Sequence, residues 1–173
     1  FRQVHPLQGG ETILYHAAAG GVGLVACQWA RAIGVTMIGT VSTEAKAEVA
    51  RAHGCDHVIL YGREDVAKRV RELTGGAGVS VVYDSVGKDT FAASLDSVKR
   101  RGLVVVVGTA SGPVPPLDVT QLAIKGSVFV TFGHVAAGRI RIEINQRYAL
   151  EDAARAHRDL ESRKTTGSSV FVV

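Results

Sequence analysis

Apolar residues follow two different patterns along positions 1–131. Short runs rich in Val, Ile and Leu are typical of strands buried in a sheet, and they alternate with segments whose apolar residues have helical spacing. The predicted strands lie at residues 12–16, 36–41, 57–60, 79–84, 103–107 and 126–131. The predicted helices lie at residues 24–33, 43–53, 64–73 and 89–98. Because strands that alternate with helices pair in parallel, the pattern predicts an α/β domain with helices on both faces of one sheet.

Residues 132–173 follow a different pattern. Residues 140–148 alternate apolar and polar side chains like a half-exposed strand, residues 150–163 have helical spacing, and residues 168–173 are again strand-like. Such alternation suits a separate sheet with one exposed face. We therefore predict a doubly wound Rossmann domain of about six parallel strands over residues 1–131. Residues 132–173 are predicted to be a strand–helix–strand return segment of a second domain, most of which the chain does not contain.

The run AAAGGVG at residues 17–23 joins the first predicted strand to the first predicted helix. Small residues at Ala17 and Gly20 allow a tight turn and close approach of the backbone to a pyrophosphate, and Gly23 lets the helix pack against the sheet. The helix amino terminus would then face the anion with free N–H groups and a partial positive charge. An ordinary tight turn explains the glycines equally well, so the rest of the site must distinguish the two interpretations.

The end of the second predicted strand indicates which dinucleotide the turn would bind. Sites for NAD place an Asp or Glu there, about 20 residues beyond the glycines, to bind the ribose hydroxyls. Here the strand ends without a carboxylate, and Glu44 lies just inside the next helix. Ser42 and Lys46 offer a hydroxyl and a cation, which suit a 2′-phosphate, so the sequence favours NADP(H). The alternative is that Lys46 is an ordinary exposed lysine and Ser42 only a helix cap.

Two further glycine-containing turns follow the fourth and fifth predicted strands. They span residues 84–87 and 107–113. Ligands bind outside the carboxyl ends of parallel strands, so these turns would form the floor of the nicotinamide half of the pocket. Turns that simply reverse the chain would contain the same glycines.

Composition excludes several other classes of function. The chain has 173 residues, of which 46% are hydrophobic, and this is enough for a sizeable core. Its net charge of +4 is spread out, with basic and acidic residues interleaved over residues 63–72, which argues against nucleic-acid binding. No apolar run approaches the ~18 residues of a membrane span, and no signal peptide is expected. With only Cys27 and Cys55, we expect free thiols and a cytoplasmic protein.

Metal and nucleophile chemistry have little support in the sequence. The six histidines are scattered and the two cysteines lack ligand spacing, so we expect no zinc site. The run at 108–112 resembles a nucleophile elbow, but Ala110 occupies the position of the nucleophile.

Four stretches together carry a family resemblance: HAAAGGVG at 16–23, GGAGV at 75–79, YDSVG at 83–87 and ESRKTTG at 161–167. They resemble the quinone oxidoreductases, the zinc-independent, zeta-crystallin-like branch of the medium-chain dehydrogenase/reductases. The resemblance implies NADPH as cofactor and hydride transfer to quinones or other activated alkenes and carbonyls. It also implies a GroES-like catalytic domain that the chain lacks, and a loop and long helix missing between Thr131 and Phe132.

The resemblance further implies which residues contact the cofactor. They are Ala19, Gly20, Gly21 and Val22 at the pyrophosphate, Ser42, Lys46 and Tyr61 at the 2′-phosphate, Val86, Gly108 and Ala110 near the nicotinamide or adenosine, and Arg163 close to the cofactor. We assign no catalytic residue, because hydride transfer in this family depends mainly on positioning and electrostatics.

Two other functions stay open at this point. An enoyl-thioester reductase of the same superfamily would share every motif, and so would a non-catalytic NADPH-binding module. The expected partner is a small quinone-like substrate, with no nucleic acid or membrane. The predicted strand at residues 126–131 would form the edge of the sheet, and an apolar edge invites a second copy to pair, so we expect a homodimer.

Overall fold

The computed structural model describes residues 5–118, 120–124, 129–130, 144–149, 152, 154–155, 158 and 168–172. By its internal contacts the chain divides into two compact units, Phe1–Thr131 and Phe132–Val173.

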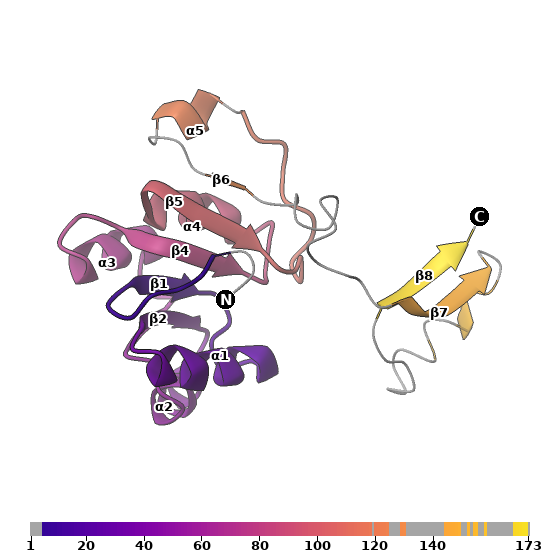
Figure 1. Cartoon of the computed structure of the whole chain (residues 1–173), viewed down its shortest axis with the longest axis horizontal. Helices are drawn as coiled ribbons and strands as arrows, with labels where there is room; N and C mark the ends of the chain where they lie inside the picture. Colours follow the sequence, from indigo (N-terminus) through magenta and orange to yellow (C-terminus); the bar gives the residue numbers. More distant parts are fainter. Residues whose placement is uncertain are drawn as a thin grey trace. The chain divides into compact units, whose positions relative to one another are not determined.

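The first unit contains a sheet of six parallel strands in the described residues (Figure 1). Its spatial order is β3-β2-β1-β4-β5-β6. The strands are β1 (Thr12–Tyr15), β2 (Thr36–Val41), β3 (His57–Leu60), β4 (Val79–Asp84), β5 (Val98–Val106) and β6 (Phe129–Val130). This is the order of a doubly wound Rossmann domain, so the predicted fold class is confirmed.

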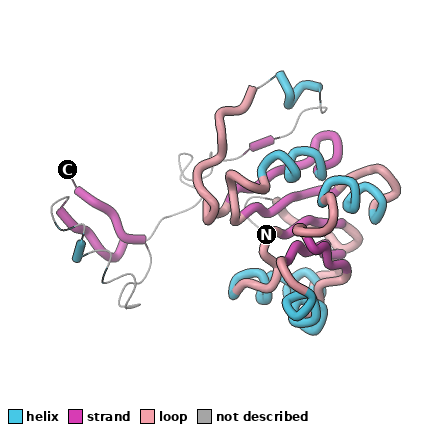
Figure 2. Tube along the Cα trace, turned by 180° about the vertical axis from the view of Figure 1, so that it is seen from behind, coloured by secondary structure: helices cyan, strands magenta, loops and turns pink. Residues whose placement is uncertain are grey.

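Helices pack on both faces of this sheet, as Figure 2 shows from behind. They are α1 (Gly21–Ala32), α2 (Glu44–Ala52), α3 (Val66–Leu73), α4 (Phe91–Ser97) and α5 (Thr120–Ile124). Successive strand residues point to opposite faces, and Ile13 and Leu14 of β1 accordingly belong to two different apolar clusters. The cluster of Ile13 includes buried residues of α1 and α2, whereas that of Leu14 includes residues of α3 and α4. Both faces are therefore covered, which explains why the strands are almost continuously apolar.

Several element bounds agree with the sequence prediction. Strands β2, β3 and β4 have the predicted limits, and α2 begins after Thr43, whose side chain accepts a hydrogen bond from the Lys46 N–H at 3.3 Å. Other bounds differ from the prediction. Helix α3 begins at Val66 and not at Glu64, because the Asp65 carboxylate caps it by accepting from the Lys68 N–H at 3.0 Å.

Strand β5 also differs from the prediction. It begins at Val98, five residues earlier than expected, and it ends before Val107, which is 56% exposed. Its pairing with β4 shifts register between Val98 and Leu103, and the residues between them form an irregular, charged and mostly exposed stretch. Because the prediction relied on runs of buried apolar residues, this exposed stretch made the predicted strand start too late. Helix α4 is shorter than predicted, and α5 was not predicted.

Strand β6 is the edge strand of this sheet. Of the predicted strand 126–131, only Phe129 and Val130 lie within the described residues, and both are in β6.

The second unit contains a separate two-stranded parallel sheet of β7 (Ile144–Ala149) and β8 (Ser168–Val172). The alternating pattern therefore did indicate a different sheet. The predicted helix at 150–163 lies mostly outside the described residues. Among the described residues of the whole chain, none of the helices has the length and apolar character needed to span a bilayer.

Candidate functional site

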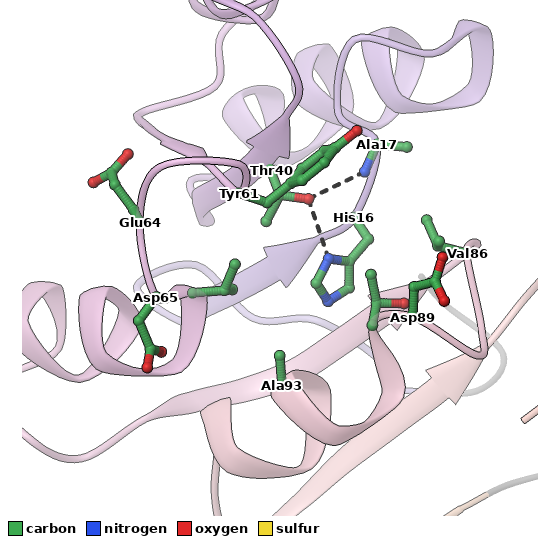
Figure 3. A pocket seen from close by; sticks show the side chains of 11 residues that line it. His16, Ala17, Thr40, Tyr61, Glu64, Asp65, Val86, Asp89 and Ala93 are labelled. Atoms are coloured by element: carbon green, nitrogen blue, oxygen red, sulfur yellow. Dashed lines mark hydrogen bonds between the residues drawn. The ribbon is translucent and has the colours of Figure 1, made fainter. Parts of the chain in front are cut away.

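The strand order reverses between β1 and β4. The chain passes from β1 outward to β2 and β3, and then returns to β4 on the other side. Loops from the two neighbouring strands diverge at such a point and leave a crevice at the carboxyl ends of the strands. A cavity of about 440 Å³ lies there, lined by residues that follow β1, β3 and β4 and by Thr40 of β2 (Figure 3). They include His16, Tyr61, Val86 and Thr90.

A second hollow of about 160 Å³ adjoins this cavity, because Ala17, Thr40 and Tyr61 line both. Its other lining residues include Ala19 and Gly20 of the glycine turn. Ser42 and Lys46 also line it. Together the two cavities form one groove that leads from the glycine turn past the ends of β2 and β3 toward α3 and α4. The structure thus brings together several predicted contact residues from separate parts of the sequence.

The glycine turn owes its shape to close backbone packing. Ala17 adopts a positive φ of 58°, which is uncommon for a residue other than glycine. At Gly23 an added Cβ would lie 2.5 Å from the Ala18 carbonyl oxygen and 2.6 Å from that of Ala17. Only glycine fits at this position, and its absence of a side chain lets α1 start directly against the turn. The sequence predicted that Gly23 lets the helix pack against the sheet, and the structure shows its close contact to be with the backbone of the turn.

Helix α1 begins without a side-chain cap. Its cap residue, Gly20, makes no side-chain hydrogen bond, and the first turn contains no acid. By contrast, Thr43 caps α2 and Asp65 caps α3. The first N–H groups of a helix need partners, and they carry the positive end of the helix dipole. Gly21 and Val22 are exposed residues, so the N–H groups at the start of α1 are suited to binding an anion.

Ser42, Lys46 and Tyr61 are exposed and line the smaller part of the groove. The cap of α2 is Thr43, so the alternative view of Ser42 as a simple helix cap was wrong. The carboxylate of Glu44 pairs with Arg51 at 3.0 Å within the same helix. The mouth of the groove therefore carries a hydroxyl, a phenol and an ammonium group.

The other predicted contacts lie farther along the sheet. Val86 lines the larger cavity. Gly108 and Ala110 lie in the turn after β5, and that turn packs on the one after β4: Ala110 donates its N–H to the Ser85 carbonyl at 3.3 Å. A Cβ on Gly108 would lie 2.9 Å from the same oxygen. Arg163 lies outside the described residues.

Sequence reasoning missed a buried polar cluster beneath the groove. Asp84 is fully buried, and its carboxylate accepts hydrogen bonds from the Val86 and Gly87 N–H groups and from the hydroxyls of Thr90 and Ser94, at 2.7–2.9 Å. Burial alone would raise the pKa of Asp84, but these hydrogen bonds outweigh it and hold the pKa below its usual value. The group is therefore a carboxylate. The available signal was a charged residue at the end of an otherwise apolar strand.

The two cysteines are buried free thiols, as expected. The hydrogen bond with Cys27, together with burial, raises the pKa of the Cys55 thiol. Among the described residues, no cluster of His, Cys, Asp and Glu could hold a metal ion.

The sheet order, the glycine turn and the uncapped helix at the reversal point define a dinucleotide-binding domain of the Rossmann type. The family model described as zinc-binding dehydrogenase matches residues 21–143, and the chain belongs to that family.

Known proteins similar to this chain include quinone oxidoreductases. A quinone oxidoreductase of Pseudomonas aeruginosa is 54% identical over 99% of this chain and 59% of its own length. A 2-haloacrylate reductase of a Burkholderia species is 43% identical over 98% of the chain and 58% of its own length. The crystal structure of the Escherichia coli quinone oxidoreductase complexed with NADPH is 44% identical, with a TM-score of 0.73, and the match covers 99% of this chain and 60% of that one.

The chain is shorter than these relatives. It spans about 59% of the length of the curated quinone oxidoreductases that it matches. The alignment with the Pseudomonas aeruginosa protein runs over 192 positions, whereas the chain has 173 residues, so that relative contains residues inside the matched region that this chain lacks. A missing internal segment would produce this difference. Its expected place after Thr131 lies outside the described residues.

Proposed function

We propose that this chain binds NADPH in the groove and forms the cofactor-binding part of a quinone oxidoreductase. In this proposal residues 1–131 are the NADP(H)-binding domain, and residues 132–173 are a return segment of the catalytic domain. One observation carries the proposal: α1 starts without a cap at the reversal point of the sheet, beside the hydroxyl of Ser42 and the ammonium group of Lys46. These features suit an anionic dinucleotide with an additional phosphate.

Different residues of the groove would hold different parts of the cofactor. Ala19, Gly20, Gly21 and Val22 would hold the pyrophosphate with the backbone amides that start α1. Ser42, Lys46 and Tyr61 would surround the 2′-phosphate. The larger cavity, with its apolar Val86 and Ala93, would hold the adenosine.

The proposal also covers the nicotinamide end of the cofactor. When bound, NADPH supplies a hydride to a quinone or to a related activated alkene or carbonyl. The turn with Gly108 and Ala110 lies beyond β5, where it would border the nicotinamide, and Arg163 would approach the cofactor from the return segment. Neither a catalytic side chain nor zinc is part of the proposal, and the chain would act by positioning the cofactor.

A second candidate is reduction of an activated alkene that is not a quinone. The 43% identity to a 2-haloacrylate reductase favours it specifically, and an enoyl-thioester reductase belongs to the same chemical class. A non-catalytic NADPH-binding module is the third candidate, because no described residue is assigned a catalytic role.

Calorimetric titration of the 173-residue chain with NADPH and with NADH tests the cofactor assignment. We expect NADPH to bind more tightly, and the substitution Lys46→Glu to weaken NADPH much more than NADH. Lys99→Glu is the matched control. Lys99 follows Val98 of β5, which pairs with Val79 at the start of β4, so Lys99 lies at the opposite end of the sheet from the groove. Failure of the wild type to bind NADPH would refute the assignment, and equal losses for both cofactors would refute the role of Lys46.

Oxidation of NADPH by 1,4-benzoquinone, 2-chloroacrylate and a crotonyl thioester tests the three candidate functions. Turnover with the quinone supports the main proposal, and preference for either alkene supports the second candidate. NADPH binding without any oxidation is the result expected both for the binding module and for a cofactor-binding part that is inactive without its catalytic domain. Unchanged affinity and turnover after treatment with a zinc chelator would support independence from zinc.

The proposal also includes a homodimer and a cytoplasmic location. Strand β6 is the edge of the sheet, so a second copy could pair there and extend it. Sedimentation equilibrium would detect the dimer, and a monomer at all concentrations would exclude it. The two free thiols support a reducing compartment, which cell fractionation can test.

A further inference from the structure

A continuous chain of hydrogen bonds runs from the glycine turn into the core, and Figure 3 shows its upper part. The Ala17 N–H donates to Thr40 Oγ1 at 3.4 Å, and Thr40 Oγ1 lies 3.1 Å from His16 Nδ1. On the other side of the ring, His16 Nε2 lies 3.0 Å from Ser94 Oγ, which donates to Asp84 Oδ2 at 2.7 Å. These hydrogen bonds thus link the turn after β1 with β2, α4 and β4 beneath the groove.

The direction of every hydrogen bond in this chain follows from its buried end. Asp84 is a carboxylate and can only accept, so the Ser94 hydroxyl hydrogen points toward Asp84. Ser94 Oγ must then accept from His16, which places a hydrogen on Nε2. A neutral ring with hydrogen on Nε2 has a free lone pair on Nδ1, so Nδ1 accepts from the Thr40 hydroxyl. That leaves Thr40 Oγ1 as the acceptor for the Ala17 N–H.

The surroundings of His16 fit this neutral form. The side chain is 1% exposed, and burial lowers its pKa, although the nearby Asp84 charge opposes that shift. A charged ring would carry a second hydrogen on Nδ1, which would face the hydrogen that Thr40 now donates. One of these two donors would then lose its partner.

The upper end of the chain holds a strained part of the glycine turn. Ala17 has a φ of 58°, and conformations of this kind persist where surrounding contacts fix them. Thr40 supplies two such contacts: its hydroxyl oxygen accepts from the Ala17 N–H, and its carbonyl oxygen accepts from the Ala18 N–H at 3.1 Å. A turn that is already ordered spares the ligand the entropic cost of ordering it.

We propose that His16 is a positioning residue for the dinucleotide. As the Nε2–H tautomer it donates to Ser94, which donates to Asp84, and it accepts from the Thr40 hydroxyl. The Thr40 oxygen is then oriented to accept from the Ala17 N–H, and this preforms the turn that receives the pyrophosphate. This inference rests on the proposed binding of NADPH. It adds a residue that is not among those expected to hold the phosphates and that takes no part in hydride transfer.

Long-range ¹H–¹⁵N correlation spectra of the labelled chain give the tautomer directly, without any cofactor. We expect the His16 ring at neutral pH to be neutral with hydrogen on Nε2, and its signals are assigned by their loss in His16→Gln. A ring with hydrogen on Nδ1, or a charged ring, would overturn the inference. Because no ligand is involved, this measurement is independent of the proposed function.

The pair Ser94→Ala and Ser97→Ala tests the effect on binding. Both serines are buried in α4, but the Ser97 hydroxyl donates to the Ala93 carbonyl at 2.7 Å and takes no part in the hydrogen-bond chain through His16. We expect Ser94→Ala to weaken NADPH about 3- to 10-fold, the effect of losing one hydrogen bond, and Ser97→Ala to leave the affinity unchanged. Equal affinities of the two folded variants would overturn the inference, whereas a wild type that binds no NADPH would refute the proposed function itself.

Thr40 provides the rescue test. Thr40→Val removes the hydroxyl at nearly constant volume, and Thr40→Ser keeps it. We expect NADPH to bind to Thr40→Ser within about twofold of the wild type, and to Thr40→Val as weakly as to Ser94→Ala. Strong binding of NADPH by Thr40→Val would contradict the proposed role of the hydrogen-bond chain, because the Thr40 hydroxyl would then be unnecessary for binding.

Discussion

Replacing Gly23 by alanine tests the packing of the glycine turn most directly. The added Cβ would lie 2.5 Å from the Ala18 carbonyl oxygen, whereas real Cβ atoms essentially never come within 3.0 Å of such an atom. The neighbouring atoms belong to the backbone of the turn, so either α1 or the turn must move by about half an ångström to restore that separation. We expect the substitution to disturb both stability and the shape of the groove.

The magnitude follows from two opposing effects. Overpacking costs about 1–3 kcal/mol, and alanine gains up to about 1 kcal/mol over glycine inside a helix, so the net loss should be about 1–2 kcal/mol. Gly21→Ala is the matched control in the same helix, because its Cβ would meet nothing within 4 Å. We expect this control to be neutral or slightly stabilising.

Urea unfolding can measure both variants. The single tryptophan, Trp29, lies in α1, so its fluorescence follows the helix concerned. Far-ultraviolet circular dichroism shows whether the rest of the fold unfolds with it. If Gly23→Ala is as stable as Gly21→Ala, the close packing of α1 on the turn does not constrain this position and the reasoning fails.

Three further predictions concern stability. Asp84→Asn replaces an acceptor of four hydrogen bonds with an amide that faces some of the same donors, and it should cost about 2–4 kcal/mol in urea unfolding; an unchanged midpoint would contradict the described network. Thr43→Ala removes the cap of α2 and should cost about 1 kcal/mol, whereas Ser42→Ala, which removes no cap, should change stability little. The folded pKa of His16 lies below its ordinary value of 6.5, so the folded state binds fewer protons there: stability should be constant with respect to this group above about pH 6.5 and should fall below it. The lowered pKa of Asp84 adds a second loss below its ordinary value of 3.8. The other titratable groups that line the cavity with His16 are Tyr61, Glu64, Asp65 and Asp89. In His16→Gln the first loss should be absent from the pH dependence of the urea midpoint, and an unchanged profile would show that other groups cause it.

The sequence predicted the limits of β2, β3 and β4 because each is a short run rich in apolar and β-branched residues. Burial is nearly complete in β2 and β4, and Gly78 and Asp84 mark the two ends of β4. The start of β5 was missed because charged residues 99–101 interrupt the run in an irregular stretch, where Arg101 has a positive φ of 58°. A pattern of side-chain burial cannot detect pairing that the backbone alone maintains.

Some parts of the candidate site could likewise be predicted from the sequence, and others could not. The glycine turn is local, so its small residues and its position between a strand and a helix were visible in one stretch of sequence. The grouping of Ser42 and Lys46 with Tyr61 required the family resemblance, because most of α2 and all of β3 lie between Lys46 and Tyr61 in the sequence. The hydrogen-bond chain through His16 was not predicted at all.

The reason is that this chain depends on strand register. His16 is one residue beyond β1, and Tyr15 pairs with Gly39 of β2, so the register places His16 beside Thr40. A slip of one residue would turn the Thr40 hydroxyl to the opposite face of the sheet and disconnect the ring from it. Sequence periodicity gives the orientation of each strand separately but not the register between two strands. Strands β1 and β2 must also hold their native register for Ala17, in the turn proposed to receive the pyrophosphate, to keep its hydrogen bond to Thr40. We therefore expect the proposed affinity of the turn for a dinucleotide to be coupled to the packing of Ser94 and Asp84 on the other side of His16. Substitutions at Ser94 can measure that coupling without touching the ligand.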